Sequence, residues 1–370
     1  MISRPLFSHT PVRAGVIANP QAGLGPDVVR ATIKSIVNAV TQALSTWRIV
    51  VLRDGFSAHA TAASDTPIES VASPATATDS GHSAEILLAA GVDVLIGVGG
   101  DGTLADIAAA IVRDGRCVPL LGVGVGSSNV GPLVSVCGQG MSAVDFGSLE
   151  SGGVHGVEVF RSKSSLGIAF NDVVFGNLYF GTREGKRVDL DAAAHLRGDD
   201  RPTKPWSVCL ETTYVKKNGR AVLDGKRHRL AQIVASPLNE SRVYAGKVAS
   251  GLMSWGPYLG RPAVIAGISE VAIRTVVDDE LLARVEPLSL YHVCFGPDDT
   301  IEVGGLDRAA VVVLDGNPVW HVELGESIAL KLRPDVLHVL RTTGSRSWEA
   351  SKLPEPCGDG SAQAEERSRG

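Results

Sequence analysis

The sequence lacks the features that mark several classes of protein. Its apolar runs stop after about ten residues, too few to span a bilayer. Its five cysteines are an odd number without a C-x-x-C pair, which argues against a disulfide framework or a zinc site. No H-E-x-x-H or G-x-S-x-G motif is present, so a zinc peptidase and a serine hydrolase are poorly supported.

Positive charges do not exceed negative ones, since 35 Lys and Arg residues stand against 40 Asp and Glu residues. The formal net charge of -5 argues against a dedicated nucleic-acid binder. The first 13 residues contain no continuous apolar stretch of the kind found in signal peptides. We therefore expect a cytoplasmic protein with no membrane or nucleic-acid partner.

The length and the sequence pattern predict two domains. The chain has 370 residues, with 44% hydrophobic and 20% charged residues, as in ordinary globular proteins. We expect an α/β domain with a parallel sheet over residues 1–150, a mostly β domain over residues 151–341, and a disordered tail over residues 342–370.

The first 150 residues alternate between apolar runs of strand length and amphipathic runs of helix length, which is the pattern of a parallel sheet with crossover helices. We expect strands at 14–18, 48–52, 92–98 and 118–123, and helices at 27–44, 84–90 and 104–113. Between them, residues 56–80 are rich in Ala, Ser, Thr and Pro and predict a surface excursion.

Beyond residue 153 the chain has short β-type runs with turn residues between them. These runs lie at 157–160, 166–170, 207–214, 232–235, 271–277, 289–295, 309–314 and 327–332. Whether the chain returns to the first domain after residue 334 is left open by the sequence.

The most informative stretch is the run from Gly99 to Thr103, which reads GGDGT and follows an apolar strand directly. Glycines at a strand-to-helix junction let a ligand approach the main chain, and the free amides at a helix start favour an anion. We expect Gly99, Gly100, Gly102 and Thr103 to bind phosphate. The plainer alternative is a tight turn in which Asp101 only caps the helix.

A second glycine-rich loop follows the next predicted strand. It contains Gly124, Gly126, Ser127, Ser128 and Asn129. Ligands of open parallel sheets bind at the carboxyl ends of the strands, so the two loops are expected to line one crevice. The alternative is that this second loop is only a flexible turn.

The GGDGT motif resembles the signature of the superfamily that holds NAD kinases, diacylglycerol and sphingosine kinases, and 6-phosphofructokinases. The strand and turn at residues 14–20 and the Asn171-Asp172 segment are similar to elements of NAD kinases, as is the run from 311 to 317 with its Asp315-Gly316 pair. Residues 236–242 match the second-domain motif of NAD kinases poorly. For this reason the chain looks more like the divergent branch of the family that includes acetoin-catabolism X-type proteins.

This resemblance implies a kinase that phosphorylates a hydroxyl, with ATP or another phosphoryl donor, Mg²⁺, and NAD or a small polyol as the acceptor. It places Asn19 at the nucleotide and Asn171, Asp172 and Asp315 at the acceptor, and it implies a homodimer or homotetramer. Asp101 is expected either to deprotonate the acceptor hydroxyl or to bind the metal beside it, and the residues leave both roles open.

Three alternatives accompany this interpretation. Asn171-Asp172 is also a common turn sequence without any ligand. The polar residues 182–204 either fold over a substrate or form a solvated loop. A nucleotide-binding sensor without turnover is the rival function from another class.

Overall fold

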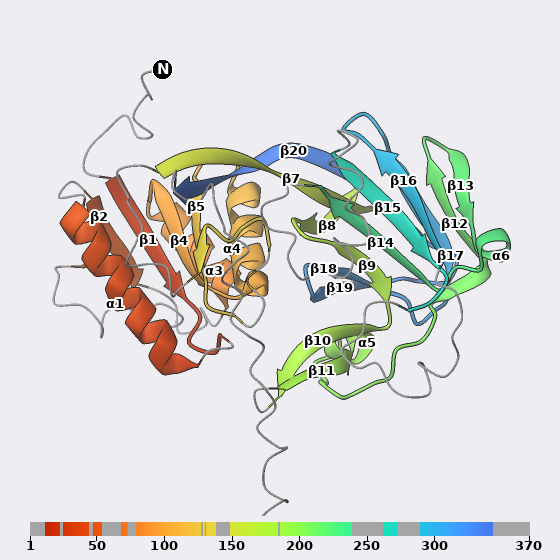
Figure 1. Ribbon diagram of the computed structural model, residues 1–370, viewed down its shortest axis with the longest axis horizontal. Helices are drawn as coiled ribbons and strands as arrows, with labels where there is room; N and C mark the ends of the chain where they lie inside the picture. Colours follow the sequence, from red (N-terminus) through yellow and green to blue (C-terminus); the bar gives the residue numbers. More distant parts are fainter. Residues whose placement is uncertain are drawn as a thin grey trace, which may run out of the picture.

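The structure, a computed structural model, describes residues 12–22, 25–43, 47–53, 68–72, 79–126, 129, 131–137, 149–183, 186–238, 262–271 and 289–342. Within these ranges the chain forms an α/β part at its N-terminal end and a mostly β part after it (Figure 1). No helix of the described residues is long and apolar enough to cross a membrane.

The α/β part is built on parallel strands. The order β3-β2-β1-β4-β5-β6 combines β1 (Val12–Ala18), β2 (Trp47–Leu52), β3 (Glu69–Val71), β4 (Val94–Gly99), β5 (Leu120–Gly124) and β6 (Val136–Cys137), and every pair in it is parallel. The central strands β1, β4 and β5 are almost continuously apolar and buried, because helices cover both faces of the sheet there.

Successive residues of one strand bury into opposite layers. In β4, Ile96 packs with α1 (Pro26–Ala43), whereas Leu95 packs with α3 (Ser80–Ala89) and α4 (Asp101–Asp114). The helix breakers act as the sequence predicts, since Gly91 and Gly115 take positive φ values of 77° and 78° at the ends of α3 and α4. Because β1, β4 and β5 are parallel, their carboxyl ends lie at one edge of the sheet, between the two helix layers.

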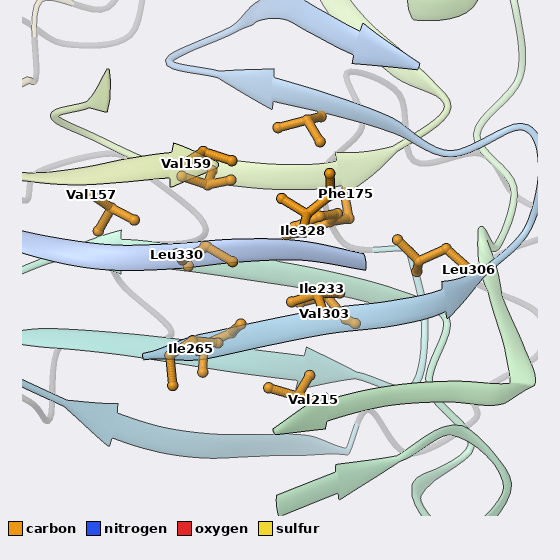
Figure 2. Packing of buried hydrophobic residues seen from close by; sticks show 14 of the residues in the cluster. Val157, Val159, Phe175, Val215, Ile233, Ile265, Val303, Leu306, Ile328 and Leu330 are labelled. Carbon is orange, nitrogen blue, oxygen red and sulfur yellow. The ribbon is translucent and has the colours of Figure 1, made fainter. Parts of the chain in front are cut away.

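The second part is a sandwich of two sheets. One sheet has the order β16-β15-β14-β9-β18-β19, and it combines β9 (Val173–Gly176), β14 (Gln232–Pro237), β15 (Ala263–Ile268), β16 (Leu290–Phe295), β18 (Val311–Leu314) and β19 (Asn317–His321). Facing it are β7 (Leu149–Arg161), β8 (Ser164–Ala169), β12 (Cys209–Lys217), β13 (Arg220–Asp224), β17 (Ile301–Leu306) and β20 (Ser327–Thr342). Figure 2 shows residues of both sheets, among them Val159, Ile328 and Phe175, meeting in one core.

Shorter elements surround this sandwich. The hairpin of β10 (Leu178–Arg183) and β11 (Lys186–Asp191) leads into α5 (Ala192–His195), and α6 (Gly225–His228) follows β13. Alanines of α5 pack on the outer face of the sheet, beside Val311 and Val313 of β18.

The long strand β20 joins the two parts. It pairs with β17 near Leu330 and runs antiparallel to β7 over most of its length, and at Val339 it pairs in parallel with Leu120 of β5. The chain thus returns to the first sheet after residue 334, a point that the sequence leaves open.

The predicted fold class is confirmed, and most predicted elements lie within one to four residues of their expected bounds. Helix α4 begins at Asp101, three residues before its predicted start. The predicted run at 271–277, the serines of the second glycine loop and the proposed tail at 342–370 lie wholly or almost wholly outside the described residues. The predicted boundary at residue 150 falls within β7, and it remains a prediction.

Candidate functional site

The first glycine loop connects β4 to α4 at the free end of the parallel sheet. Gly100 is the N-cap residue, with extended backbone angles of φ -84° and ψ 179° and no side-chain cap bond. Asp101 is the first residue of the helix rather than its cap, which corrects the plainer interpretation of this residue. Its carboxylate is half-buried and accepts a bond of 2.8 Å from the backbone N–H of Gly131.

The second glycine loop lies directly against the first. The amide of Val125 donates to the carbonyl of Gly99 at 2.9 Å. A Cβ placed on Gly126 would stand only 2.6 Å from the Cα of Gly100, so the two backbones touch at a distance that no other residue permits. The loops form one continuous backbone surface.

Asn129 closes the second loop. Its Oδ1 accepts from the N–H of Gly126 at 2.7 Å, and its Nδ2 donates to the carbonyl of the same residue at 2.6 Å. Asn129 itself takes a positive φ of 48°, a conformation that asparagine tolerates well. The sequence predicts Asn129 as a phosphate contact, whereas both ends of its side-chain amide bind its own loop.

The turn after β1 completes this edge of the sheet. The backbone N–H of Asn19 donates to the carbonyl of Val98 at 2.9 Å, and its Nδ2 donates to the hydroxyl of Thr103 at 2.9 Å. Its Oδ1 accepts from the N–H of Gln21 at 2.9 Å. The structure therefore brings Asn19, Thr103 and both glycine loops together, as expected from three strands that end at one edge.

Asn171 comes from the second part of the chain and approaches Asp101 across this edge. A Cβ placed on Gly131 would lie 2.6 Å from Oδ1 of Asp101 and 2.9 Å from Oδ1 of Asn171, so both oxygens lie near one point. Asn171 is 6% exposed, and its Oδ1 is a buried oxygen without a hydrogen-bond partner among the described residues. A buried amide oxygen of this kind favours a bound donor or cation.

Asp315 binds the backbone of the acceptor segment, and its predicted contact with the acceptor itself remains a prediction. Its carboxylate accepts three backbone bonds, from the N–H groups of Phe170 at 2.8 Å, Asn171 at 2.7 Å and Asp172 at 3.0 Å. Asp315 and Gly316 take φ values of 49° and 88°, as a tight hairpin turn between β18 and β19 requires. Its oxygens thus shape the segment 170–172. Asp172 is half-buried, and its role as an acceptor ligand remains a prediction.

Three contacts of this region could not be found from the sequence. Asp106 of α4 accepts from the hydroxyl of Ser80 at 2.8 Å and from Nδ2 of Asn317 at 3.0 Å, and burial raises the pKa of its carboxyl. Arg341 of β20 donates from Nη2 to the carbonyl of Pro132 at 2.8 Å. Each joins segments distant in the sequence, and no local motif marks any of them.

The donor atoms near Asp101 suit a hard cation better than a soft one. The described residues contain no cluster of three or more His, Cys, Asp or Glu side chains that would hold a metal unaided. Mg²⁺ is commonly bound by one or two protein oxygens together with substrate phosphates. The carboxylate of Asp101 and the unpartnered oxygen of Asn171 fit that mode.

Negative charge at Asp101 also acts on a neighbouring thiol. Cys137 ends β6, and burial together with the charge of Asp101 raises the pKa of its thiol. Tyr179 of β10 donates its hydroxyl proton to Asp200 of the polar stretch 182–204 at 2.8 Å, and Nδ1 of His195 lies 2.6 Å from the same carboxylate. These contacts join the polar stretch to the β10–β11 hairpin.

The family model of the ATP-NAD kinase N-terminal domain matches residues 14–130. A protein of Archaeoglobus fulgidus, itself described as uncharacterized, is 31% identical over 247 residues, which are 66% of this chain and 74% of that protein.

Two solved structures are similar in fold alone. A yeast NADH kinase complexed with NADH has a TM-score of 0.53 at 11% identity, covering 96% of this chain and 94% of that one. A diacylglycerol kinase from Bacillus anthracis has a TM-score of 0.50 at 11% identity, covering 92% of this chain and all of that one, 100%. The family match over residues 14–130 and the relative from Archaeoglobus fulgidus establish that the chain belongs to the NAD kinase-like family.

Proposed function

We propose that this protein is an ATP-dependent kinase that phosphorylates a hydroxyl group of NAD, with a small polyol as the alternative acceptor. The observation that carries the proposal is the convergence of Asp101 and the unpartnered oxygen of Asn171 beside the paired glycine loops. Membership of the NAD kinase-like family supports phosphoryl transfer. A cytoplasmic location and a homo-oligomeric state remain predictions.

Phosphoryl transfer requires chiefly positioning and charge stabilisation. In the proposed step, the acceptor oxygen forms a bond to the γ-phosphorus while the bond to the leaving ADP oxygen breaks. The hydroxyl proton passes to the carboxylate of Asp101, which the N–H of Gly131 orients. In the alternative role of Asp101, its carboxylate and the oxygen of Asn171 would instead hold Mg²⁺, which when bound would neutralise phosphate charge.

The backbone of the glycine loops would receive the donor. Gly100 and Gly126 bring two main chains within touching distance, and the amides at the start of α4 lie at the positive end of a helix. Asn171 and Asp172 would bind the acceptor, because amide and carboxylate groups suit the vicinal hydroxyls of a ribose or polyol.

The test is ADP release by the purified protein, with ATP or polyphosphate as the donor and NAD, NADH and a polyol panel as acceptors. We expect Asp101→Asn to lower turnover at least about a hundredfold, the scale of general-base catalysis. Asp114→Asn, at the exposed end of the same helix, is the matched control and should keep its turnover. Retained turnover in Asp101→Asn would contradict the proposed role, and tight ATP binding without turnover by the wild type would favour a sensor.

The side-chain length at residue 172 distinguishes the acceptors. With NAD as the acceptor, Asp172→Glu should preserve or improve activity, because NAD kinases carry Glu at the matching position. With a smaller polyol, the longer side chain should crowd the site and lower activity. Asp172→Ala should raise the acceptor KM in either case, and equal activity of all three proteins would place residue 172 outside the site.

A further inference from the structure

The position of Asn171 relative to Asp101 depends on how the two parts of the chain pack together. Asp101 begins α4 of the α/β part, whereas Asn171 follows β8 of the sandwich. A misplacement of catalytic groups by about 1 Å can lower the reaction rate about a hundredfold. A contact that fixes these two segments relative to each other therefore matters for transfer.

The hairpin turn between β18 and β19 lies between the two segments. On one side, Asp315 accepts the three amides of residues 170–172. On the other side, Asn317 donates from Nδ2 to Oδ1 of Asp106 in α4 at 3.0 Å. One short turn thus binds both the acceptor segment and the helix that begins with Asp101, and Figure 1 shows β18 and β19 on the side of the sandwich that faces α3 and α4.

The Asp106 carboxylate is itself fixed. Its Oδ2 accepts from the hydroxyl of Ser80 at the start of α3, and Asp79 caps that helix by accepting from the N–H of His82 at 2.7 Å. Asp106 is half-buried, whereas Asn317 is exposed. The exposed amide contributes little to the core, so its bond to Asp106 serves better to fix a position than to stabilise the fold.

We propose that Asn317 and Asp106 form a clasp between the two parts of the chain, and that this clasp positions the acceptor segment 170–172 against Asp101. The clasp rests on the proposed function for its catalytic meaning, but its structural effect is independent of turnover. Asn317 and Asp106 are positioning residues, because neither contacts the reacting atoms.

The experiment compares the wild type with Asn317→Ala, which removes the amide without opening a core cavity. Amide hydrogen exchange of residues 170–172 is measured on the full chain without ligand, and steady-state transfer is measured with ATP and NAD. We expect exchange in this segment to accelerate at least about fivefold, because these amides depend on the turn that the clasp anchors. We expect kcat to fall about tenfold while the KM for ATP stays within about twofold.

Asn218→Ala is the matched control. Asn218 is also an exposed hairpin asparagine, in the distant turn between β12 and β13, and its Nδ2 donates to Asp299 at 2.7 Å. The substitution should change neither the exchange of residues 170–172 nor kcat. The exchanged pair Asp106→Asn with Asn317→Asp keeps a donor facing an acceptor and should recover most of the lost protection.

Each result decides one question. Unchanged exchange at residues 170–172 in Asn317→Ala overturns the clasp, as does equal acceleration in Asn218→Ala. Accelerated exchange in a protein that transfers phosphate to no acceptor supports the clasp and refutes the proposed function.

Discussion

The substitution Gly102→Ala tests whether Gly102 is required for ligand binding rather than for folding. Gly102 lies in the first turn of α4, and a Cβ built there meets no atom within 4 Å. Alanine is favoured over glycine inside a helix by roughly 0.5–1 kcal/mol. We therefore expect Gly102→Ala to fold normally and to raise the Tm by about 1–4 °C.

Activity should change in the opposite direction. If donor phosphates lie against the amides at the start of α4, the new methyl group occupies space that the ligand needs. We expect kcat/KM for ATP to fall at least tenfold, which corresponds to about 1.4 kcal/mol of lost transition-state stabilisation. Thermal denaturation and ADP release on the same preparation measure both quantities.

Gly99 and Gly126 provide the comparison, because their Cβ atoms would stand 2.5 Å from the side chain of Thr103 and 2.6 Å from the Cα of Gly100. Alanine at either position should lower stability and activity together. Gly102→Ala with a raised Tm and undiminished ATP kinetics would refute the phosphate-binding role of this loop.

Two further predictions concern ionisable groups. Asp101→Asn removes a charge that raises the pKa of the Cys137 thiol, so iodoacetamide should alkylate Cys137 up to about threefold faster. Mass spectrometry measures this rate, with Cys209, whose pKa burial raises to about 12, as the unreactive reference. An unchanged alkylation rate would show that Asp101 does not lie near Cys137. For Glu326, burial acts to raise the pKa, but bonds from Trp320 at 3.0 Å, the Glu323 N–H at 2.9 Å and Arg161 at 2.6 Å hold it below its ordinary value of 4.5. Glu326→Gln should lower the free energy of unfolding at pH 7 by about 1–3 kcal/mol. This stabilisation is present above the ordinary Glu pKa and is lost as the pH falls. In urea titrations, the difference in unfolding free energy between the wild type and Glu326→Gln should therefore shrink below about pH 4.5. A difference that stays constant with pH would contradict this prediction.

Local chemistry made the α/β part predictable. Buried strands read as apolar runs, and Gly91 and Gly115 end their helices where the chain must adopt positive φ. Three loops at the carboxyl ends of neighbouring strands must meet, so the proximity of Asn19 to Thr103 follows from topology. The candidate site could be placed at this edge for the same reason.

Contacts made at long range could not be predicted in this way. The approach of Asn171 to Asp101 depends on how the sandwich packs against the α/β part, and sequence spacing carries no information on that packing. The same holds for the bond between Asn317 and Asp106. Asp315 lies in the hairpin turn between β18 and β19, and its three bonds to residues 170–172 depend on the pairing of β18 with β9, which no local pattern marks.

The pairing of Val339 with Leu120 has a consequence for the order in which the chain can fold. The hydrophobic layer under α3 and α4 includes Leu337 and Val339 of β20 and Val154 of β7. During synthesis, the parallel sheet of the α/β part is complete before β20 emerges, so part of its hydrophobic core stays uncovered until that strand is made. Pairings between such distant segments slow folding, and an uncovered β5 edge invites association between chains. A fragment that ends before β7 should therefore aggregate rather than behave as an independent nucleotide-binding module.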